Sequence, residues 1–174
     1  MTTLLHDAFR HHAWANDRML EACANLTAEQ LASSTVGTFG PILDTLRHLI
    51  GSDNWYLWVI TEGRHAEFDE ETAGIDELKA GAKRSAAGWE ELLARDLDPD
   101  EMTVRQGDGW EFTAPLGVRL AQAIQHGTDH RSQIATALTT LGVEPPGIDV
   151  WEWAESVGRT HERQLDPTRS NAGT

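Results

Sequence analysis

The chain has 174 residues, 40% of them apolar, which is enough for one domain of ordinary size with a hydrophobic core. Its 28 acidic and 14 basic residues give a net charge of −14, which argues against nucleic acid and anionic membranes as partners. The single cysteine, Cys23, excludes an internal disulfide or a paired-cysteine metal site. Because no apolar stretch approaches the roughly 20 residues that span a bilayer, and no export signal is visible, we expect a cytoplasmic protein.

Four long segments repeat apolar residues at steps of three and four, the spacing of one helix face. We expect helices over residues 3–25, 42–60, 75–98 and 115–141. Pro41 suits the start of the second helix, and Gly142 suits the end of the last. Residues 27–30 have the pattern of a capping box, but polar and glycine residues follow too soon for more than a turn or two of helix.

The connections between these helices complete the expected fold. Residues 61–74 are acidic and punctuated by glycine, so they predict a surface connection. Apolar and polar residues alternate over 100–114, which indicates a short hairpin, with a long loop as the alternative. Residues 150–157 can form a short C-terminal helix, and residues 163–174 a frayed polar tail. The pattern predicts an all-α protein, a four-helix bundle in a single domain over residues 1–162.

Three of the eight histidines predict a metal site. His126 and His130 lie four residues apart on one helix, so their Cβ atoms are about 6 Å apart and both rings can reach one ion. Their face also carries Ala123 and Ile134, so the pair points into the bundle, where an unpaired polar group costs roughly 1–3 kcal/mol. His48 lies in a polar row of the central helix 42–60. Three imidazoles from two helices would leave a coordination position open, as catalytic sites do.

Several neighbours are candidates for supporting roles. Gly127, between the two histidines, predicts close packing there, either by a neighbouring helix or ligand at the metal face or by plain helix–helix contact. Asp44 and Gln122 each lie one turn before a histidine and could accept a ring N–H, or be solvated. Arg131 could hold a substrate carboxylate or form a salt bridge. Trp110 could form the wall of a pocket mouth or a dimer contact, or simply pack in a small hydrophobic cluster outside the main core. The other five histidines are expected to be solvated: His6, His11, His12, His65 and His161.

Three stretches resemble the signatures of the DinB/YfiT-like superfamily: residues 9–16, residues 45–50 followed by Trp55, and residues 126–134. The resemblance covers about residues 5–155 in matching order. It implies an up-down-down-up four-helix bundle, often dimeric, in which His48, His126 and His130 bind zinc or nickel. It also implies the chemistry of transferases and isomerases that use glutathione, mycothiol or bacillithiol. Asp129 departs from the pattern, since many members have a histidine there, but the three ligands remain.

These observations leave three functional hypotheses. The first is a metal enzyme in which water or a low-molecular-weight thiol, held at the open position, attacks a small electrophilic substrate, as in an S-transferase, isomerase or hydrolase. The second is a non-catalytic metal-binding or stress-related protein, and the third is an interaction module with buried structural histidines. We expect a small-molecule substrate and a homodimer. Imidazole suits zinc, nickel, copper and iron, so the residues alone leave the metal open.

Overall fold

The computed structural model describes residues 4–163, which are mostly helical with one small sheet. Its elements, in chain order, are α1 (Leu4–Cys23), α2 (Ala28–Leu31), α3 (Ile42–Ile60), α4 (Ile75–Leu93), β1 (Met102–Gly107), β2 (Trp110–Pro115), α5 (Leu116–Thr140) and α6 (Val150–Ser156). No helix within residues 4–163 is both long and apolar enough to cross a membrane. The expected tail lies outside the described residues, apart from residue 163.

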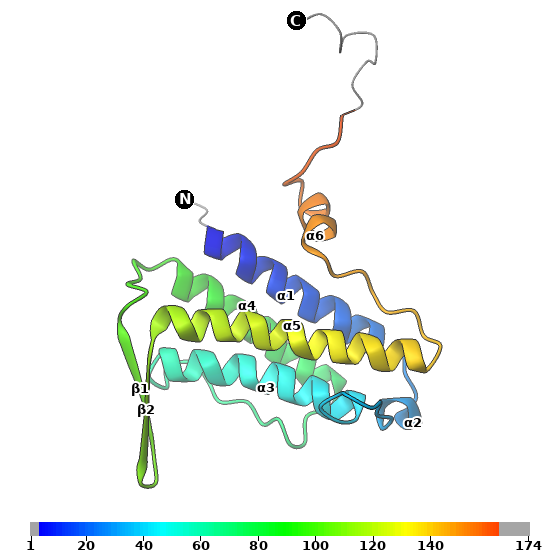
Figure 1. Cartoon of the computed structure of the whole chain (residues 1–174), viewed down its shortest axis with the longest axis horizontal. Coiled ribbons are helices and arrows are strands. Elements are labelled where there is room, and N and C mark those ends of the chain that lie inside the picture. Colours follow the sequence, from blue (N-terminus) through cyan, green and yellow to red (C-terminus); the bar gives the residue numbers. More distant parts are fainter. Residues whose placement is uncertain (1–3, 164–174) are drawn as a thin grey trace, which may run out of the picture.

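The four long helices pack side by side. Helix α1 packs against both α4 and α5, and helix α3 packs against the same two helices. Figure 1 shows α1 and α5 running in one direction and α3 and α4 in the other. Because α3 and α4 run in the same direction, the connection over residues 61–74 has to return along the whole length of α3, and Figure 1 shows it doing so. This return path brings residues of the connection close to the side of α3.

Helix α3 is buried on several sides, as its apolar sequence predicts. Leu46, Leu49, Ile50 and Leu57 are all at most 1% exposed. One core cluster gathers around Leu46 and Ile50 with residues of α1, α4 and α5, and a second forms around Leu57 towards the other end of the helices. Because α3 takes part in both clusters, its orientation relative to α5 is fixed. The side of α3 that faces α5 carries the candidate site.

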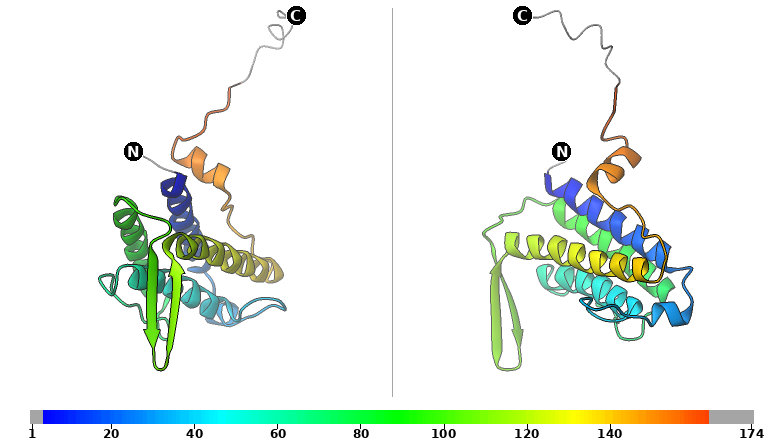
Figure 2. Two further views of the ribbon diagram at one scale, coloured as in Figure 1. Left: turned by 60° about the vertical axis from the view of Figure 1, so that its left-hand side comes forward. Right: turned by 45° about the vertical axis from the view of Figure 1, so that its right-hand side comes forward.

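The segment before α5 is a hairpin rather than a loop. Strands β1 and β2 pair antiparallel, with Gly107 opposite Trp110, and Gly109 closes the turn at a φ of 77°, which glycine adopts without strain. Figures 1 and 2 show the hairpin projecting away from the helices. The capping box is also confirmed, since Gln30 N donates to Thr27 Oγ1 and Thr27 N donates to Gln30 Oε1.

Candidate metal centre

The three predicted histidines meet in the structure. His48 comes from the middle of α3, and His126 and His130 come from successive turns of α5. The Nε2 atom of His126 lies 3.2 Å from Nε2 of His48 and 3.1 Å from Nε2 of His130. One ligand nitrogen from each ring falls within 4.8 Å of the other two, and no Asp, Glu or Cys joins this group among the described residues.

This donor set fits a metal ion. Nitrogen ligands about 2.0–2.1 Å from a tetrahedral zinc ion are separated from one another by roughly 3.3 Å, close to the 3.2 Å and 3.1 Å that separate Nε2 of His126 from the other two rings. Three nitrogen tips that approach one another need a shared proton or a cation between them, because their lone pairs otherwise repel. The three imidazoles therefore have the donor type and spacing that a divalent ion requires.

The surroundings keep the three rings neutral, which is the form that binds metal. Burial lowers the pKa of His126 to about 4, with further lowering from the neighbouring His130 and His48. Burial also lowers the pKa of His48 and of His130 below the ordinary histidine value. Protons therefore compete with a metal less at this site than they would at solvated imidazoles.

Two residues that the sequence did not single out hold the rings in place. The side-chain oxygen of Gln133 accepts the backbone N–H of Phe39 at 2.8 Å and lies 3.3 Å from Nδ1 of His130. Because that oxygen is an acceptor, Nδ1 of His130 carries the proton and Nε2 keeps its lone pair for a ligand. The Phe39 ring stacks on His48 at 4.4 Å with the ring planes 5° apart, and its centroid lies 5.3 Å from that of His130. The loop before α3 thus covers one side of the site.

A cavity of about 520 Å³ opens beside the histidines. Its wall includes His48 and His126 and is completed by residues of α3 and the following connection: Gly51, Ser52, Trp55, Tyr56, Phe68 and Glu70. Trp55 on α3 is 40% exposed and stands in this wall rather than in the core. The cavity gives a small molecule access to the histidine cluster.

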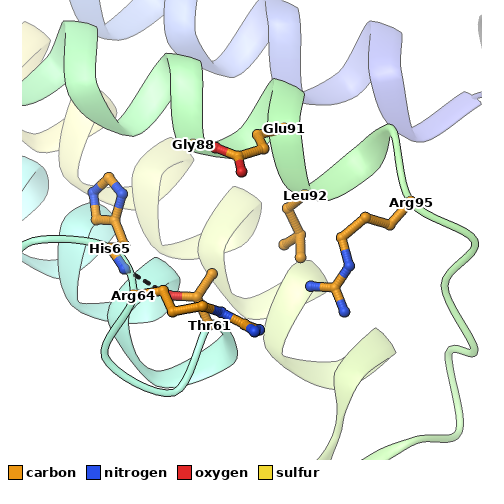
Figure 3. A pocket seen from close by; sticks show the side chains of 7 residues that line it. All are labelled: Thr61, Arg64, His65, Gly88, Glu91, Leu92 and Arg95. Carbon is orange, nitrogen blue, oxygen red and sulfur yellow. Dashed lines mark hydrogen bonds between the residues drawn. The ribbon is translucent and has the colours of Figure 1, made fainter.

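A second cavity of about 370 Å³ lies between the end of α3 and α4 and is shown in Figure 3. Arg64 and Arg95 line it, together with Glu91 and His65. The His65 ring, which was expected to be solvated, bonds through Nε2 to the buried Asn54 at 2.9 Å. Among the described residues, no set of three metal-ligating side chains gathers at this cavity, so the histidine cluster remains the candidate site.

The predicted supporting residues have other partners. Asp44 accepts a hydrogen bond from Arg47 at 3.0 Å, and Gln122 donates to the hydroxyl of Tyr56 at 3.3 Å, so each engages a group other than a histidine ring. Asp129 accepts from the Gln125 amide at 3.0 Å. Trp110 lies on β2, is 52% exposed, and stands outside the wall of the histidine cavity. Asp44 and Gln122 each lie one helical turn before a histidine, but this spacing does not determine the rotamers of their side chains.

Arg131 is 2% exposed and so does not line the cavity as a substrate contact. It follows His130 on α5 and turns towards α1, where it donates to Asn16 Oδ1 at 2.6 Å and lies 3.2 Å from Nδ1 of His12. His12 in turn lies 3.0 Å from Asp53 on α3. Burial acts to raise the pKa of Asp53, but the interaction with His12, together with those of the Trp89 side chain and the Ser85 hydroxyl, lowers that pKa overall. These residues form a buried polar network directly behind the face of α5 that carries the candidate metal site.

His12 is fully buried, so the expectation that it is solvated is wrong. Its position on the core stripe of α1, four residues before the buried Asn16, was the signal that could have placed it inside. Gly127 makes room for this ring: a Cβ there would collide with Cε1 of His12 and lie 2.8 Å from its Nδ1. The close approach at Gly127 is therefore helix–helix packing against α1.

Comparisons with known proteins bear on the family and the fold of this chain. The family model described as DinB family matches residues 1–164. A crystal structure of a DinB-like protein from Bacillus cereus is similar in fold, with a TM-score of 0.66 and 16% sequence identity. That similarity covers 83% of this chain and 95% of the other chain. A search of curated proteins finds no match.

Proposed function

Because this chain belongs to the DinB family, we propose that His48, His126 and His130 bind one divalent metal ion, zinc or nickel, in an enzyme for a small electrophilic substrate. The observation that carries the proposal is the convergence of three imidazole nitrogens within 4.8 Å of one another. An adjoining cavity of about 520 Å³ supports a catalytic over a structural role, because a structural ion is normally enclosed by four protein ligands.

A divalent ion supplies Lewis-acid chemistry, which stabilises the anion of water or of a thiol and so provides a nucleophile at neutral pH. Other side chains of the protein orient and cover the histidines for this chemistry. Gln133 sets the tautomer of His130. Phe39 covers the face of His48 and limits access from the loop side. The open side faces the cavity, where the substrate would enter, and thiol-dependent transfer, isomerisation and hydrolysis are the reaction types proposed.

The proposal includes an up-down-down-up four-helix bundle formed by α1, α3, α4 and α5, which the helix directions and contacts support. It also includes a homodimer. Light scattering should give twice the chain mass at micromolar concentration, and a monomer mass would remove the dimer from the proposal.

The test is a rate measurement with a panel of low-molecular-weight thiols and the electrophile chlorodinitrobenzene. Protein loaded with zinc or nickel should accelerate formation of the thiol adduct above the uncatalysed rate with at least one thiol. Metal-stripped protein and His126→Ala should fall to background. His161→Ala, which changes an exposed histidine of the C-terminal segment, should retain the parent rate. Equal rates for the loaded parent and His126→Ala would refute a metal-dependent reaction at this site.

A further inference from the structure

The connection between α3 and α4 delivers a carboxylate to the cavity beside the histidines. Glu70 lies on this connection and lines the cavity together with His48 and His126. Its side chain packs on α3 at Gly51, where an added Cβ would fall 2.7 Å from Cβ of Glu70 and collide with its carboxylate. Since Gly51 is three residues after His48 on the helix, the carboxylate and the imidazole share one face of α3.

The carboxylate of Glu70 is available to a ligand. It does not belong to the group of metal-ligand atoms within reach of the three histidines. The ion pairs of residues 4–163 join other acids, and none involves Glu70. Glu70 as a whole is exposed, but partial burial of its carboxylate, with repulsion from Glu71, raises its pKa, so a cation beside it would stabilise the anion. Among the described residues that line the cavity, Glu70 is the one acidic side chain, and no lysine or arginine is among them.

Aromatic rings complete the wall, and they suit a cation as well as an apolar group. Trp55, Tyr56 and Phe68 all line the cavity. The ring of Trp55 already lies 5.9 Å from the guanidinium of Arg105, within the range of a cation–π contact. A net charge of −14 also draws cations towards the molecule.

We propose that this cavity binds a small molecule with a protonated amine, held by Glu70, and an apolar body packed on the rings of Trp55 and Phe68. The amine donates a charge-assisted hydrogen bond to the carboxylate, which is stronger than a bond between neutral groups. The opposite end of the molecule then lies towards the histidines. This inference rests on the proposed function, because it names the class of substrate for that site.

The experiment is a heteronuclear NMR titration of the full chain, following the indole N–H of Trp55 with three probes of similar size. The probes are phenethylamine, which is cationic, phenylethyl alcohol, which is neutral, and phenylacetate, which is anionic. The parent should prefer the amine to the other two. Glu70→Gln should weaken amine binding about tenfold, as expected for loss of a charged partner, and leave alcohol binding unchanged. Glu71→Gln, the matched change at an exposed neighbour, should alter amine binding less than about twofold.

Glu70→Asp, which keeps the charge on a shorter side chain, should restore part of the affinity for the amine. The inference is overturned if Glu70→Gln binds the amine as the parent does, if the parent binds the alcohol as tightly as the amine, or if no amine binding is seen. Zinc content, measured on the same samples, separates this failure from failure of the proposed function. A parent without zinc refutes the metal site, whereas full zinc with unchanged amine binding by Glu70→Gln refutes only the amine subsite.

Discussion

Replacing Gly127 by alanine should have two effects on the stability of the protein, and they act in opposite directions. Alanine in a helix interior is about 1 kcal/mol more favourable than glycine, so propensity alone predicts a more stable protein. In the structure, however, the new Cβ would collide with the buried His12 ring and lie 2.9 Å from Nη1 of Arg131. Overpacking of this kind costs typically 1–3 kcal/mol, and relief by moving His12 would weaken its bond to Asp53. We expect a net loss of about 1 kcal/mol or more, or roughly 2–4 °C in Tm for a chain of this size.

The assay is urea unfolding followed by circular dichroism, in a double-mutant cycle with His12→Ala. Without the imidazole the space at Gly127 opens, so Gly127→Ala should become neutral or stabilising in that background. Ser132→Ala, an exposed change on the same helix, should be neutral or slightly stabilising. A Gly127→Ala protein that is more stable than the parent, or one with the same effect in both backgrounds, would refute the contact as the reason for glycine.

Two further predictions concern buried charge. In the metal-free protein, burial holds the pKa of His126 at about 4 against 6.5 when unfolded, so its contribution to stability is complete above about pH 6.5 and is lost as the pH falls towards 4. Urea unfolding should show about 1–2 kcal/mol less stability near pH 5 than near pH 7, allowing for the solvent that this half-buried ring still contacts, and a gain at the lower pH would contradict it. Asp53→Asn should lower the free energy of unfolding by about 3 kcal/mol, because it leaves His12 and Arg131 without their buried anion. Asp44→Asn, in an exposed pair, should cost less than about 1 kcal/mol, and equal losses for the two variants would count against the network.

Helical periodicity was sufficient to predict most elements of this fold. The expected helix over 42–60 coincides with α3, because Pro41 and the turn residues after Ile60 limit the apolar stretch on both sides. The third long helix ends at Leu93, although the sequence predicts it to 98. The chain leaves the helix several residues before Pro99, and Leu97 packs instead against the core cluster around Leu57. A breaker residue limits how far a helix can extend without fixing where it stops.

The sequence likewise predicts some residues of the candidate site and not others. Spacing on α5 predicted the pair of His126 and His130, and the polar row on α3 predicted that His48 would join them. Phe39 and Glu70 were not predicted, because both lie on connections whose paths depend on how the helices pack. The return of the chain along α3 follows from the parallel directions of α3 and α4, which no local pattern in residues 61–74 reveals.

Metal content tests the central claim most directly. The purified parent, loaded with zinc and freed of excess, should contain one zinc per chain by mass spectrometry, and so should His161→Ala. His48→Ala, His126→Ala and His130→Ala should each lose stoichiometric zinc while keeping their helical circular dichroism, since alanine favours the helix. If those three variants keep zinc as the parent does, the three histidines are not the ligands and the account of this site is wrong.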